Sequence, residues 1–528
     1  MTGLIALVGF LVFAARRLLT YLHIFQQEEY DGPRFLRWLW RNAALDRRLS
    51  LAIFAIFILQ LIVGSSASDW VFPLAVCVLC LAAAAIERDP RKNAKKPLAM
   101  TARAKRIYAV GDLLLLLIGV VAVFTTDTAL VWLVLVQLVP VALVIGNLLL
   151  MPSETRVQRR YWQEAHDTLK KLDPMVIAVT GSYGKTSVKH ILGHVLETAA
   201  PTLITPGSVN TAMGIARIIR EQLRPHHRYL VVEMGAYGIG SIARLCALTP
   251  PRLGIITAIG KAHYERFKTL DAVARAKFEL AEAAHANGGS AIVVSDTLQF
   301  DWPRRYVEAH RDRVVTVGPE TDADLVIRSL QQETDGIIAD VQWRGRTYQL
   351  KSPLFGEHQG RNIALAFAAG CNLGLAPEDV IASLHSTPQI AHRLEVKRQG
   401  ETIVIDDAYN SNPVGFASAL ELLDVLKPPG GRRILVTPGM VELGAAHQEE
   451  HEKIGRLAAA HVDVLVAVAP QRVEPLASAF KAAAPEREIV PCAGFAEARQ
   501  WLDKNLAGLD VVLIENDLPD LYERRLSL

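Results

Sequence analysis

Four apolar segments near the start of the chain limit what this region can fold into. Each is close to the ~20 residues that a helix needs to cross ~30 Å of hydrocarbon. Helices of a large soluble core would show a polar face, and these segments show none. We therefore predict four membrane-spanning helices. They cover residues 49–66, 70–86, 108–124 and 129–151.

A fifth span is predicted over Gly3–Ala15. This segment is short, so it must tilt, or Arg16 and Arg17 must extend their charges to the interface. Basic residues follow the segment and do not precede it, unlike the arrangement in a signal peptide. We expect an anchor with its N-terminus outside the cell.

Charge is distributed unevenly along the chain. Residues 1–151 hold 15 Lys and Arg against 9 Asp and Glu, a net charge of +6, so the rest must carry −3 to reach the total of +3. The basic residues lie between the first and second spans and within 87–106, so the positive-inside rule predicts that these loops are cytoplasmic. Five spans then place residue 152 onward in the cytoplasm as well. The pattern indicates attraction to membrane lipid and argues against a nucleic-acid partner.

The cysteines indicate neither a disulfide framework nor a metal site. Five cysteines are too few for such a framework in a chain of 528 residues. Cys77 and Cys80 form a CxxC pair inside an apolar run, and we predict that both are buried side chains rather than redox or metal-binding groups.

From Pro174 onward, short β-branched runs alternate with helical stretches. This alternation predicts an α/β fold with a parallel sheet and a ligand site at the carboxyl ends of its strands. A more polar β-rich segment, 323–352, and a helix from about Gly360 follow. We therefore predict a transmembrane region (1–151), a central P-loop ATP-binding domain (152–394) and a smaller Rossmann-like domain (395–528). The expected strands of the two soluble domains cover residues 176–180, 229–234, 253–259, 290–295, 403–406, 433–437, 463–468 and 511–515.

A glycine turn between a predicted strand and a predicted helix carries the clearest chemical signal. Its glycines allow backbone N–H groups to point inward, and the helix that follows presents its positive end to an anion. Lys185 is expected on the β- and γ-phosphates, and the Thr186 hydroxyl on Mg²⁺. The spacing G-x-x-G-K-T is shorter than the general P-loop pattern, and an ordinary glycine-rich turn is the alternative. The predicted phosphate-binding residues are Gly181, Ser182, Tyr183, Gly184, Lys185, Thr186 and Ser187.

Several separated motifs between about residue 174 and residue 470 occur in the order of one known family. The chain resembles the Mur ligases, the ATP-dependent amide-forming enzymes of peptidoglycan synthesis, and is most similar to the branch that adds D-alanyl-D-alanine. The motifs are VTGSYGKTSVK, VVEMGAYGIGSI, AHYERF followed by ARAKFELAE, GEHQGRNIALA, HRLE, IDDAYNSNP and GMVELG.

The resemblance implies a set of metal ligands. Glu233 ends an apolar strand beside the glycine turn and resembles the magnesium glutamate, although a solvated acid is the alternative. His263 resembles a second-metal ligand, whereas a lone histidine is otherwise expected to pack in a core. Lys277 resembles a lysine that CO₂ carbamylates into an anionic metal ligand. Helical spacing alone would make it an exposed lysine paired with nearby acids.

The resemblance also implies nucleotide and substrate contacts. Asn362, with His358 before it, resembles the residues that flank adenine, and the alternative is an asparagine that caps the following helix. Arg393 resembles the arginine that contacts the γ-phosphate, and Asp407 the aspartate that binds ribose. Four further residues resemble substrate or phosphate contacts, or only form turns and caps. They are Asn210, Thr211, Asn410 and Asn412.

The implied reaction joins a carboxylate to an amine through an acyl phosphate, with ATP and Mg²⁺ as cofactors. Lys185, His263, Lys277 and Arg393 are the implied catalytic residues. Because different domains would hold ribose and phosphates, closure of the last domain is expected to assemble the site.

Two departures from the family affect the expected substrates. Membrane helices stand where the family carries a domain for the UDP group, so the envelope precursor is a small molecule or linked to a lipid. Anchoring to a membrane protein assembly would also explain the helices. The family's Lys-Gly-Ser-Arg-like stretch is missing after the last strand, where Asn516 and Asp517 stand instead. The sequence therefore does not identify the amine or amino-acid substrate. These features predict a multi-pass inner-membrane protein with cytoplasmic catalytic domains.

Other interpretations remain open from the sequence alone. His447 and His451, with Glu442 nearby, could bind a metal, but a solvated helix face is favoured. The same central domain occurs in folylpolyglutamate and poly-γ-glutamate synthetases, and an inactive nucleotide-binding scaffold is a third interpretation. Transport is disfavoured because we expect the spans to bury no charge except Asp112.

Overall fold

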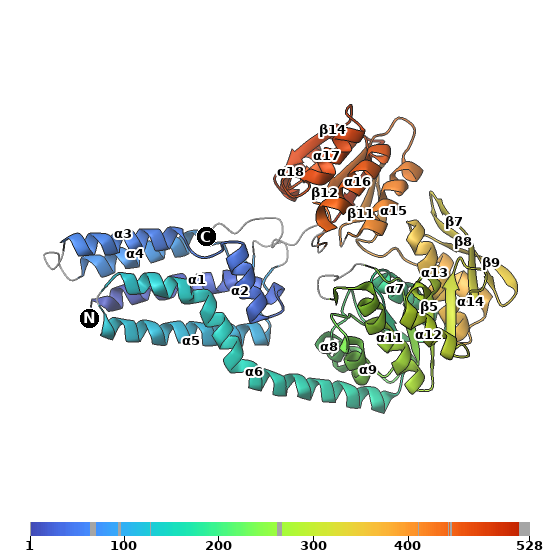
Figure 1. Ribbon diagram of the computed structural model, residues 1–528, viewed down its shortest axis with the longest axis horizontal. Coiled ribbons are helices and arrows are strands. Elements are labelled where there is room, and N and C mark those ends of the chain that lie inside the picture. Colours follow the sequence, from blue (N-terminus) through green and yellow to red (C-terminus); the bar gives the residue numbers. More distant parts are fainter. Residues whose placement is uncertain are drawn as a thin grey trace. The chain divides into compact units, whose positions relative to one another are not determined.

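The computed structural model divides the chain into two compact units, Met1–Gln158 and Arg159–Asp517. The structure describes residues 2–63, 70–92, 97–126, 128–260, 267–409, 411–441, 443 and 446–516. Figure 1 shows helices in the first unit and two sheets with flanking helices in the second.

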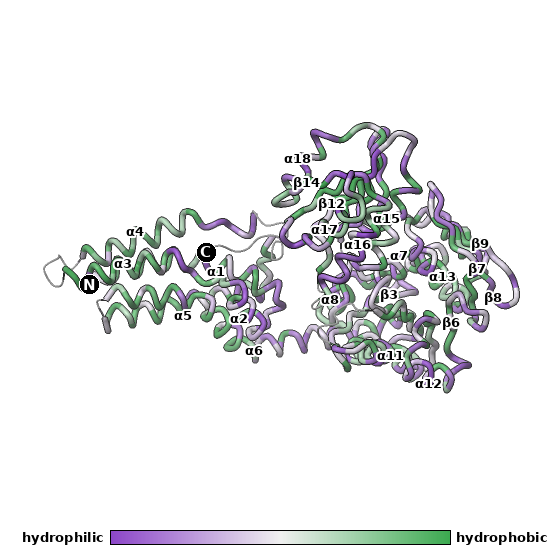
Figure 2. Tube along the Cα trace, turned by 45° about the horizontal axis from the view of Figure 1, so that its top comes forward, coloured by the Kyte–Doolittle hydropathy of each residue, from purple (hydrophilic) through white to green (hydrophobic). Residues whose placement is uncertain are grey.

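The first unit is built from apolar helices. Among the described residues, α1, α5 and α6 are long and apolar enough to cross a membrane, whereas α3 and α4 are apolar but have only 16 residues each. Figure 2 shows hydrophobic residues along these helices. The helices are α1 (Gly3–Gln27), α2 (Gly32–Arg41), α3 (Arg48–Val63), α4 (Val71–Ile86), α5 (Ala102–Thr125) and α6 (Leu130–Leu172).

Two boundaries differ most from the sequence prediction. α1 extends to Gln27 and has 25 residues, so it reaches a spanning length that Gly3–Ala15 lacks. α6 continues for 43 residues through the predicted domain boundary after residue 151. The apolar pattern ends near that boundary, but helical propensity continues through the polar residues that follow.

Arg17 is buried, so it does not extend its charge to an interface, which was one of the two alternatives for the short first span. Its side chain is only 6% exposed, and its guanidinium lies 3.0 Å from both Asp46 and Glu87. Arg16, one residue earlier, is exposed. Because α1 continues past Arg17, this side chain faces the acids that flank α3 and α4. The helical unit therefore buries an ion-paired cluster of three charged side chains, and all three lie outside the spans predicted from the sequence.

The predicted burial of Cys77 and Cys80 is confirmed. Both lie buried in α4 as free thiols. All five cysteines of the chain fall within the described ranges, and each is free and buried.

The second unit begins with the last part of α6, residues 159–172. Its first sheet has nine strands in the described part of the chain, in the order β2-β3-β1-β4-β5-β6-β7-β8-β9. Strands β2 through β7 pair in parallel, which confirms the predicted parallel sheet. The polar segment 323–352 forms the antiparallel strands at one edge. The strands are β1 (Met175–Thr180), β2 (Thr202–Ile204), β3 (Tyr229–Glu233), β4 (Leu253–Ile256), β5 (Ser290–Val294), β6 (Val314–Gly318), β7 (Leu325–Glu333), β8 (Gly336–Trp343) and β9 (Arg346–Ser352).

Helices pack on both faces of this sheet and bury its apolar side chains. One core contains side chains of α7, α13 and α14, and another contains side chains of α8, α9 and α11. This arrangement leaves the carboxyl ends of the parallel strands free to form a site. The helices are α7 (Lys185–Glu197), α8 (Ala212–Gln222), α9 (Ser241–Leu248), α11 (Leu270–Ala286), α12 (Asp301–Ala309), α13 (Glu357–Asn372) and α14 (Pro377–His385).

The second sheet has six strands within the described ranges, in the order β10-β11-β15-β12-β13-β14. β10 is antiparallel to β11, and the other pairs are parallel. The two edge strands were not predicted, because β10 is polar and β14 contains a proline. The elements are β10 (Glu395–Gln399), β11 (Thr402–Asp407), α15 (Pro413–Leu426), β12 (Arg433–Thr437), α16 (His447–His461), β13 (Val464–Val468), α17 (Glu474–Ala483), β14 (Glu488–Cys492), α18 (Phe495–Asn505) and β15 (Val511–Glu515).

Candidate active site

The glycine turn connects β1 to α7 at the carboxyl end of the first sheet. Gly181 has φ +155° and Gly184 has φ +80°, values that side chains disfavour. A Cβ atom on Gly181 would lie 1.7 Å from Thr257 Oγ1. Glycine is therefore required at position 181 by both conformation and space, and the turn leaves the N-terminus of α7 available to an anion.

The side chains of the turn hold its shape. Lys185 Nζ donates to the carbonyl oxygens of Gly181 at 2.9 Å and Ser182 at 3.1 Å. Ser182 Oγ donates to the Gly260 carbonyl at 3.0 Å, and the ring of Tyr183 packs against Gly260. Burial lowers the pKa of Lys185, and a bound anion would offset that cost.

Glu233 and Thr186 meet at the mouth of the turn. Thr186 Oγ1 donates to Glu233 Oε2 at 2.9 Å, and Asn210 Nδ2 donates to Glu233 Oε1 at 3.1 Å. Glu233 is 1% exposed, so the alternative of a solvated acid at a strand end is wrong.

Sequence reasoning missed Lys189. Its side chain is fully buried, and Nζ lies 3.4 Å from Glu233 Oε2 while also donating to the Gly207 carbonyl. Lys189 lies one helical turn after Lys185, so the i, i+4 spacing could have placed both lysines on one face of α7.

Lys277 is not the exposed lysine that helical spacing suggests. It is 4% exposed, and Nζ donates to the Gly181 carbonyl at 2.8 Å. Burial, and then the nearby Lys185, hold the pKa of Lys277 well below its usual range. The structure thus brings α11 to the glycine turn.

Arg393 reaches the same place from the segment that follows α14. Its Nη2 atom donates to Thr186 Oγ1 at 3.2 Å, and its guanidinium lies 4.5 Å from the centre of the Tyr409 ring. Tyr409 belongs to the motif IDDAYNSNP, but sequence reasoning assigned it no role. Asp407 ends β11, and its Oδ1 accepts a hydrogen bond of 3.2 Å from the backbone N–H of Leu394. Asp407 is therefore hydrogen-bonded to the residue that follows Arg393.

Asp407 has an acidic neighbour. Asp407 and Glu515 are register partners on β11 and β15, and Glu515 is fully buried. Ser411 Oγ donates to Glu515 Oε1. Burial raises the pKa of Asp407 to about 6, and burial together with Asp407 raises the pKa of Glu515 well above its usual range.

The residues predicted beside adenine lie on α13. Asn362 is in the second turn of this helix, whose N-cap is Gly356, so the capping alternative is wrong. A Cβ atom on Gly184 would lie 2.7 Å from Asn362 Oδ1, and Gln359 connects Asn362 to Ser187 through bonds of 2.8 and 3.4 Å. Burial, followed by Arg393, lowers the pKa of His358 to about 4.

Other predicted residues have local structural contacts or fall outside the described ranges. Thr211 caps α8 through a bond from the Gly214 backbone, and Asn412 caps α15 through a bond from the Gly415 backbone. Such caps account for both residues without a ligand. His263 and Asn410 lie outside the described residues.

The histidines of α16 form neither a metal site nor a solvated face. His451 is fully buried, its Nε2 accepts from the Met440 backbone at 3.0 Å, and its Nδ1 lies 2.7 Å from the His447 carbonyl. Burial lowers its pKa to about 4, so it is a neutral group that supports the Met440 loop. Glu442 and Asp517 lie outside the described residues.

Asn516 connects the ends of the second sheet's strands. Its backbone N–H donates to the Asp407 carbonyl at 3.1 Å, and its side-chain Nδ2 donates to the Gly439 carbonyl at 2.7 Å. Asn516 therefore has a structural role at the site of the family's missing motif.

One other cluster within the described ranges has metal-ligand residue types, His392, Glu395 and Asp406. Lys397 Nζ lies 2.9 Å from Glu395 and 3.1 Å from Asp406. The Lys397 ammonium pairs with both carboxylates, so the cluster is an ion-pair network.

The site as a whole fits a phosphorylated ligand with a divalent cation. Lys185, Lys189 and Arg393 surround the mouth of the turn, and their positive charge complements a polyphosphate. The Thr186 hydroxyl and the Glu233 carboxylate supply adjacent oxygen ligands of the kind that Mg²⁺ takes. The donor set therefore fits a magnesium nucleotide.

Comparisons with known proteins agree with this geometry. Residues 179–370 match the Mur ligase middle domain, and residues 392–515 match the Mur ligase glutamate ligase domain. A UDP-N-acetylmuramoyl-tripeptide--D-alanyl-D-alanine ligase of Mycobacterium tuberculosis is 31% identical over 294 residues, which are 54% of this chain and 56% of that protein. The Escherichia coli enzyme of the same name is 29% identical over 299 residues, 56% of this chain and 65% of that protein. The match thus spans less than two thirds of each relative.

Solved structures show the same fold. MurF from Acinetobacter baumannii aligns with a TM-score of 0.58 and 27% identity, covering 68% of this chain and 77% of that chain. MurF ligase from Thermotoga maritima in complex with ADP aligns with a TM-score of 0.58 and 24% identity, covering 70% of this chain and 82% of that chain. Because both family domains occur here in order and together occupy more than half of the chain, it belongs to the Mur ligase family.

Proposed function

We propose that this protein is an ATP-dependent ligase that joins a carboxylate to an amine on a peptidoglycan-type cell-wall precursor. The main structural support for this proposal is the set of hydrogen bonds made by Thr186. Its hydroxyl bonds both Glu233, at the end of β3, and Arg393, which precedes the second sheet. The two family domains thereby each contribute a side chain that contacts Thr186.

The chain's own residues would bind the nucleotide and stabilise transferred charge. Lys185 and Arg393 would contact the β- and γ-phosphates. Asn362 and His358 would lie beside adenine. Asp407 would accept a hydrogen bond from a ribose hydroxyl. Thr186 and Glu233 would hold Mg²⁺, which supplies Lewis-acid stabilisation of phosphate charge when bound.

The proposed chemistry proceeds in two steps. An oxygen of the substrate carboxylate forms a bond to the γ-phosphorus, and the bond from that phosphorus to ADP breaks. The amine nitrogen then bonds to the acyl carbon, phosphate leaves, and a proton is lost from nitrogen. The products are ADP, phosphate and an amide.

Lys277 is proposed to become a carbamate. Its lowered pKa favours the neutral amine, whose nitrogen bonds the carbon of CO₂ as one proton leaves. The product is an anion, and Lys185 lies close enough to stabilise it. The modified side chain would help to position the metal and substrate.

The N-terminal helices are proposed to anchor the enzyme in the inner membrane, with both family domains in the cytoplasm. Their length and apolar composition support anchoring, and the basic loops support the orientation. The anchor stands where the family carries a UDP-binding domain, which favours a membrane-delivered or lipid-linked acceptor. It also suits attachment to a membrane protein assembly.

The proposal is tested by ADP release from the full-length, detergent-solubilised protein. UDP-linked and lipid-linked tripeptides serve as acceptors, with D-alanyl-D-alanine and single amino acids as amines. Lys185→Ala should lower kcat/KM by about 100-fold or more, because phosphate charge loses a fixed cation. Lys504→Ala, an exposed control on α18, should retain activity. Wild-type protein that releases no ADP with any pair would contradict the proposal.

A further inference from the structure

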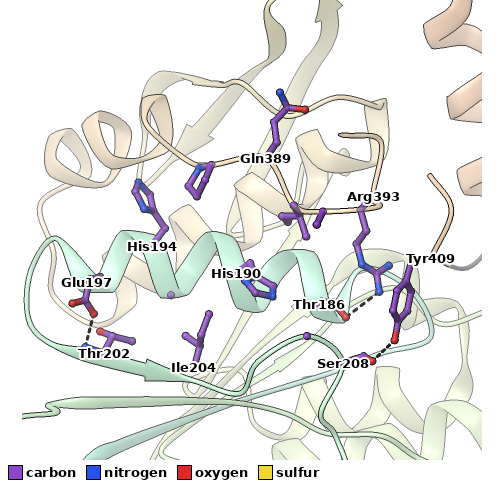
Figure 3. A pocket seen from close by; sticks show the side chains of 15 residues that line it. Thr186, His190, His194, Glu197, Thr202, Ile204, Ser208, Gln389, Arg393 and Tyr409 are labelled. Atoms are coloured by element: carbon purple, nitrogen blue, oxygen red, sulfur yellow. Dashed lines mark hydrogen bonds between the residues drawn. The ribbon is translucent and has the colours of Figure 1, made fainter. Parts of the chain in front are cut away.

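A cavity in the helical unit lies where the start of α3 meets α6. It is distinct from the cavity beside Thr186 and Arg393 that Figure 3 shows, which belongs to the candidate active site. Its volume is about 350 Å³, within the range of small-molecule sites. We call it the α3–α6 cavity.

Hydrogen bonds across the cavity fix the relative direction of its two helices. Gln137 Nε2 of α6 donates to Ser50 Oγ and to the Asp46 carbonyl, each at 2.5 Å. Farther along α3, Gln60 Oε1 accepts a hydrogen bond of 2.8 Å from the backbone N–H of Ala129, which precedes α6. The two helices therefore run in opposite directions.

The apolar lining residues all lie on one side of the polar ones. Leu51 and Phe54 follow the polar residues along α3, and Leu133 lies one turn before Gln137 on α6. Because the helices are antiparallel, these three side chains extend in the same direction, away from Arg47. The loop that contains Arg47 is predicted to be cytoplasmic, so the apolar end points into the bilayer.

The polar end of the cavity suits an anion. Both carboxylate oxygens of Asp46 are occupied, one by Arg17 at 3.0 Å and the other by the backbone N–H of Leu49 at 2.9 Å. Arg47 lines the cavity and forms no ion pair within the described ranges, so its charge is available to a ligand. Ser50 Oγ already accepts a hydrogen bond, which leaves its O–H to donate. An arginine and a hydroxyl donor together suit a phosphate group.

These features match a phospholipid with one negatively charged phosphate. A phosphodiester carries a single charge, which Arg47 can balance. A diphosphate would need further cations, and the other charged residue of the lining is the acidic Asp46. Arg48, next to Arg47, is exposed and disfavours a cationic head group such as choline. Basic pockets between membrane helices on the cytoplasmic side bind anionic head groups in this way.

We infer that the α3–α6 cavity binds an anionic phospholipid of the cytoplasmic leaflet. Its phosphate lies at Arg47 and Ser50, and the beginning of one acyl chain lies against Leu51, Phe54 and Leu133. The inference rests on the proposed membrane anchoring and adds to it a site for one lipid molecule. Because α3 has only 16 residues, a lipid held at its start would connect this short helix to the longer α6.

Lipid titration of the full-length protein in detergent micelles tests the polar end. Native mass spectrometry resolves each bound lipid as a separate mass. Wild-type protein should bind one dioleoylphosphatidylglycerol about tenfold more tightly than dioleoylphosphatidylcholine. Arg47→Gln should lower the affinity for phosphatidylglycerol about tenfold, because a charge-assisted hydrogen bond is lost. Arg48→Gln, at an exposed position outside the lining, is the matched control and should change this affinity by no more than about threefold.

A bulky substitution tests the apolar end. Leu51 is 68% exposed and lines the cavity, so Leu51→Trp occupies the path of the acyl chain without disturbing a core. It should lower the affinity for phosphatidylglycerol about fivefold or more. Leu61→Trp, at a position on the same helix that is 63% exposed and outside the lining, should bind the lipid like wild type.

Other results would overturn the inference. Equal affinities for the two lipids, or equal losses in Arg47→Gln and Arg48→Gln, would indicate attraction to a basic surface without a specific site. Displacement of phosphatidylglycerol by a smaller amount of an isoprenyl diphosphate would assign the cavity to a lipid-linked precursor. Extraction of the wild-type protein from membranes by alkaline carbonate would overturn both the anchoring and the lipid site. Lipid binding needs no turnover, so a wild-type protein that releases no ADP but binds phosphatidylglycerol as expected would contradict the proposed ligase and support this site.

Discussion

At the scale of single residues, Thr186 connects the two sheets of the second unit. Its hydroxyl donates to Glu233 and accepts from Arg393, whose positions in the chain are 160 residues apart. A threonine at the start of α7 thus contacts residues of both family domains. Under the proposed function, phosphate binding and domain position would be coupled at this residue.

Lys277 gives a prediction at this scale. Lys277→Ala should lower ligation about tenfold or more, because an anion that positions the substrate is lost. Acetate or propionate should restore part of the rate by supplying a carboxylate in the vacated space. ADP release measured with increasing acetate checks this expectation.

Lys185→Ala is the control. This substitution removes a cation, so acetate, an anion, should not restore the rate of ADP release. Failure of every short carboxylic acid to rescue Lys277→Ala would count against the carbamate.

The Asp407–Glu515 pair predicts how stability depends on pH. Both pKa values are raised in the folded protein, so the folded state holds protons that the unfolded state has lost. Stability is therefore highest at acidic pH and falls as pH rises from about 4 through the folded pKa of Asp407 near 6, and further as Glu515 ionises. The decrease from pH 5 to pH 8 should be on the order of 2 kcal/mol.

Thermal unfolding of Glu515→Gln at several pH values tests this pair. The amide can still hydrogen-bond but cannot ionise, so the alkaline decrease in stability should become smaller. Glu421→Gln, at an exposed position on α15, should follow the wild-type profile. An unchanged profile in Glu515→Gln would show that the pair does not control this dependence.

At the scale of secondary-structure elements, the turn between β1 and α7 depends on two glycines with positive φ. Gly181→Ala should abolish nucleotide binding, because its Cβ atom would meet Thr257 Oγ1 at 1.7 Å in addition to backbone strain. Binding of a fluorescent ATP analogue to the folded protein is the measurement.

Gly374→Ala separates strain from steric conflict. Gly374 also has positive φ, +91°, but a Cβ atom added there would meet nothing within 4 Å. This variant should lose only about 1 kcal/mol of stability and keep its nucleotide affinity. Equal losses of nucleotide affinity in Gly181→Ala and Gly374→Ala would mean that the steric conflict at Gly181 does not cause the loss of binding.

At the scale of the whole molecule, the proposed orientation can be tested by labelling introduced cysteines in intact cells. Thr128, between α5 and α6, should be outside, and Ala99, before α5, should be inside. A membrane-impermeant thiol reagent should therefore label Thr128→Cys in intact cells, and Ala99→Cys only after lysis. The buried native cysteines give little background.

Ala482→Cys provides a control for the catalytic unit and should also label only after lysis. Labelling of Ala99→Cys from outside would reverse the orientation. Release of the wild-type protein from membranes by alkaline carbonate would contradict anchoring altogether.

The sequence by itself determined the features that depend on local pattern. Apolar runs marked the helices of the first unit, alternating strands and helices predicted the parallel sheet, and glycine spacing located the glycine turn between β1 and α7. These features could be predicted because hydrophobic periodicity and backbone conformation act over a few neighbouring residues.

Only the tertiary structure decided which side chains meet and which charges are buried. Lys277 looked exposed on its helix but donates to Gly181, 96 residues earlier. An extended Arg17 at an interface was one alternative from the sequence, but Arg17 pairs with Asp46 and Glu87. His451 was expected on a solvated helix face but supports the Met440 loop. Burial and ion pairing depend on segments far apart in the chain, and local pattern carries no information about which of these segments will pack together.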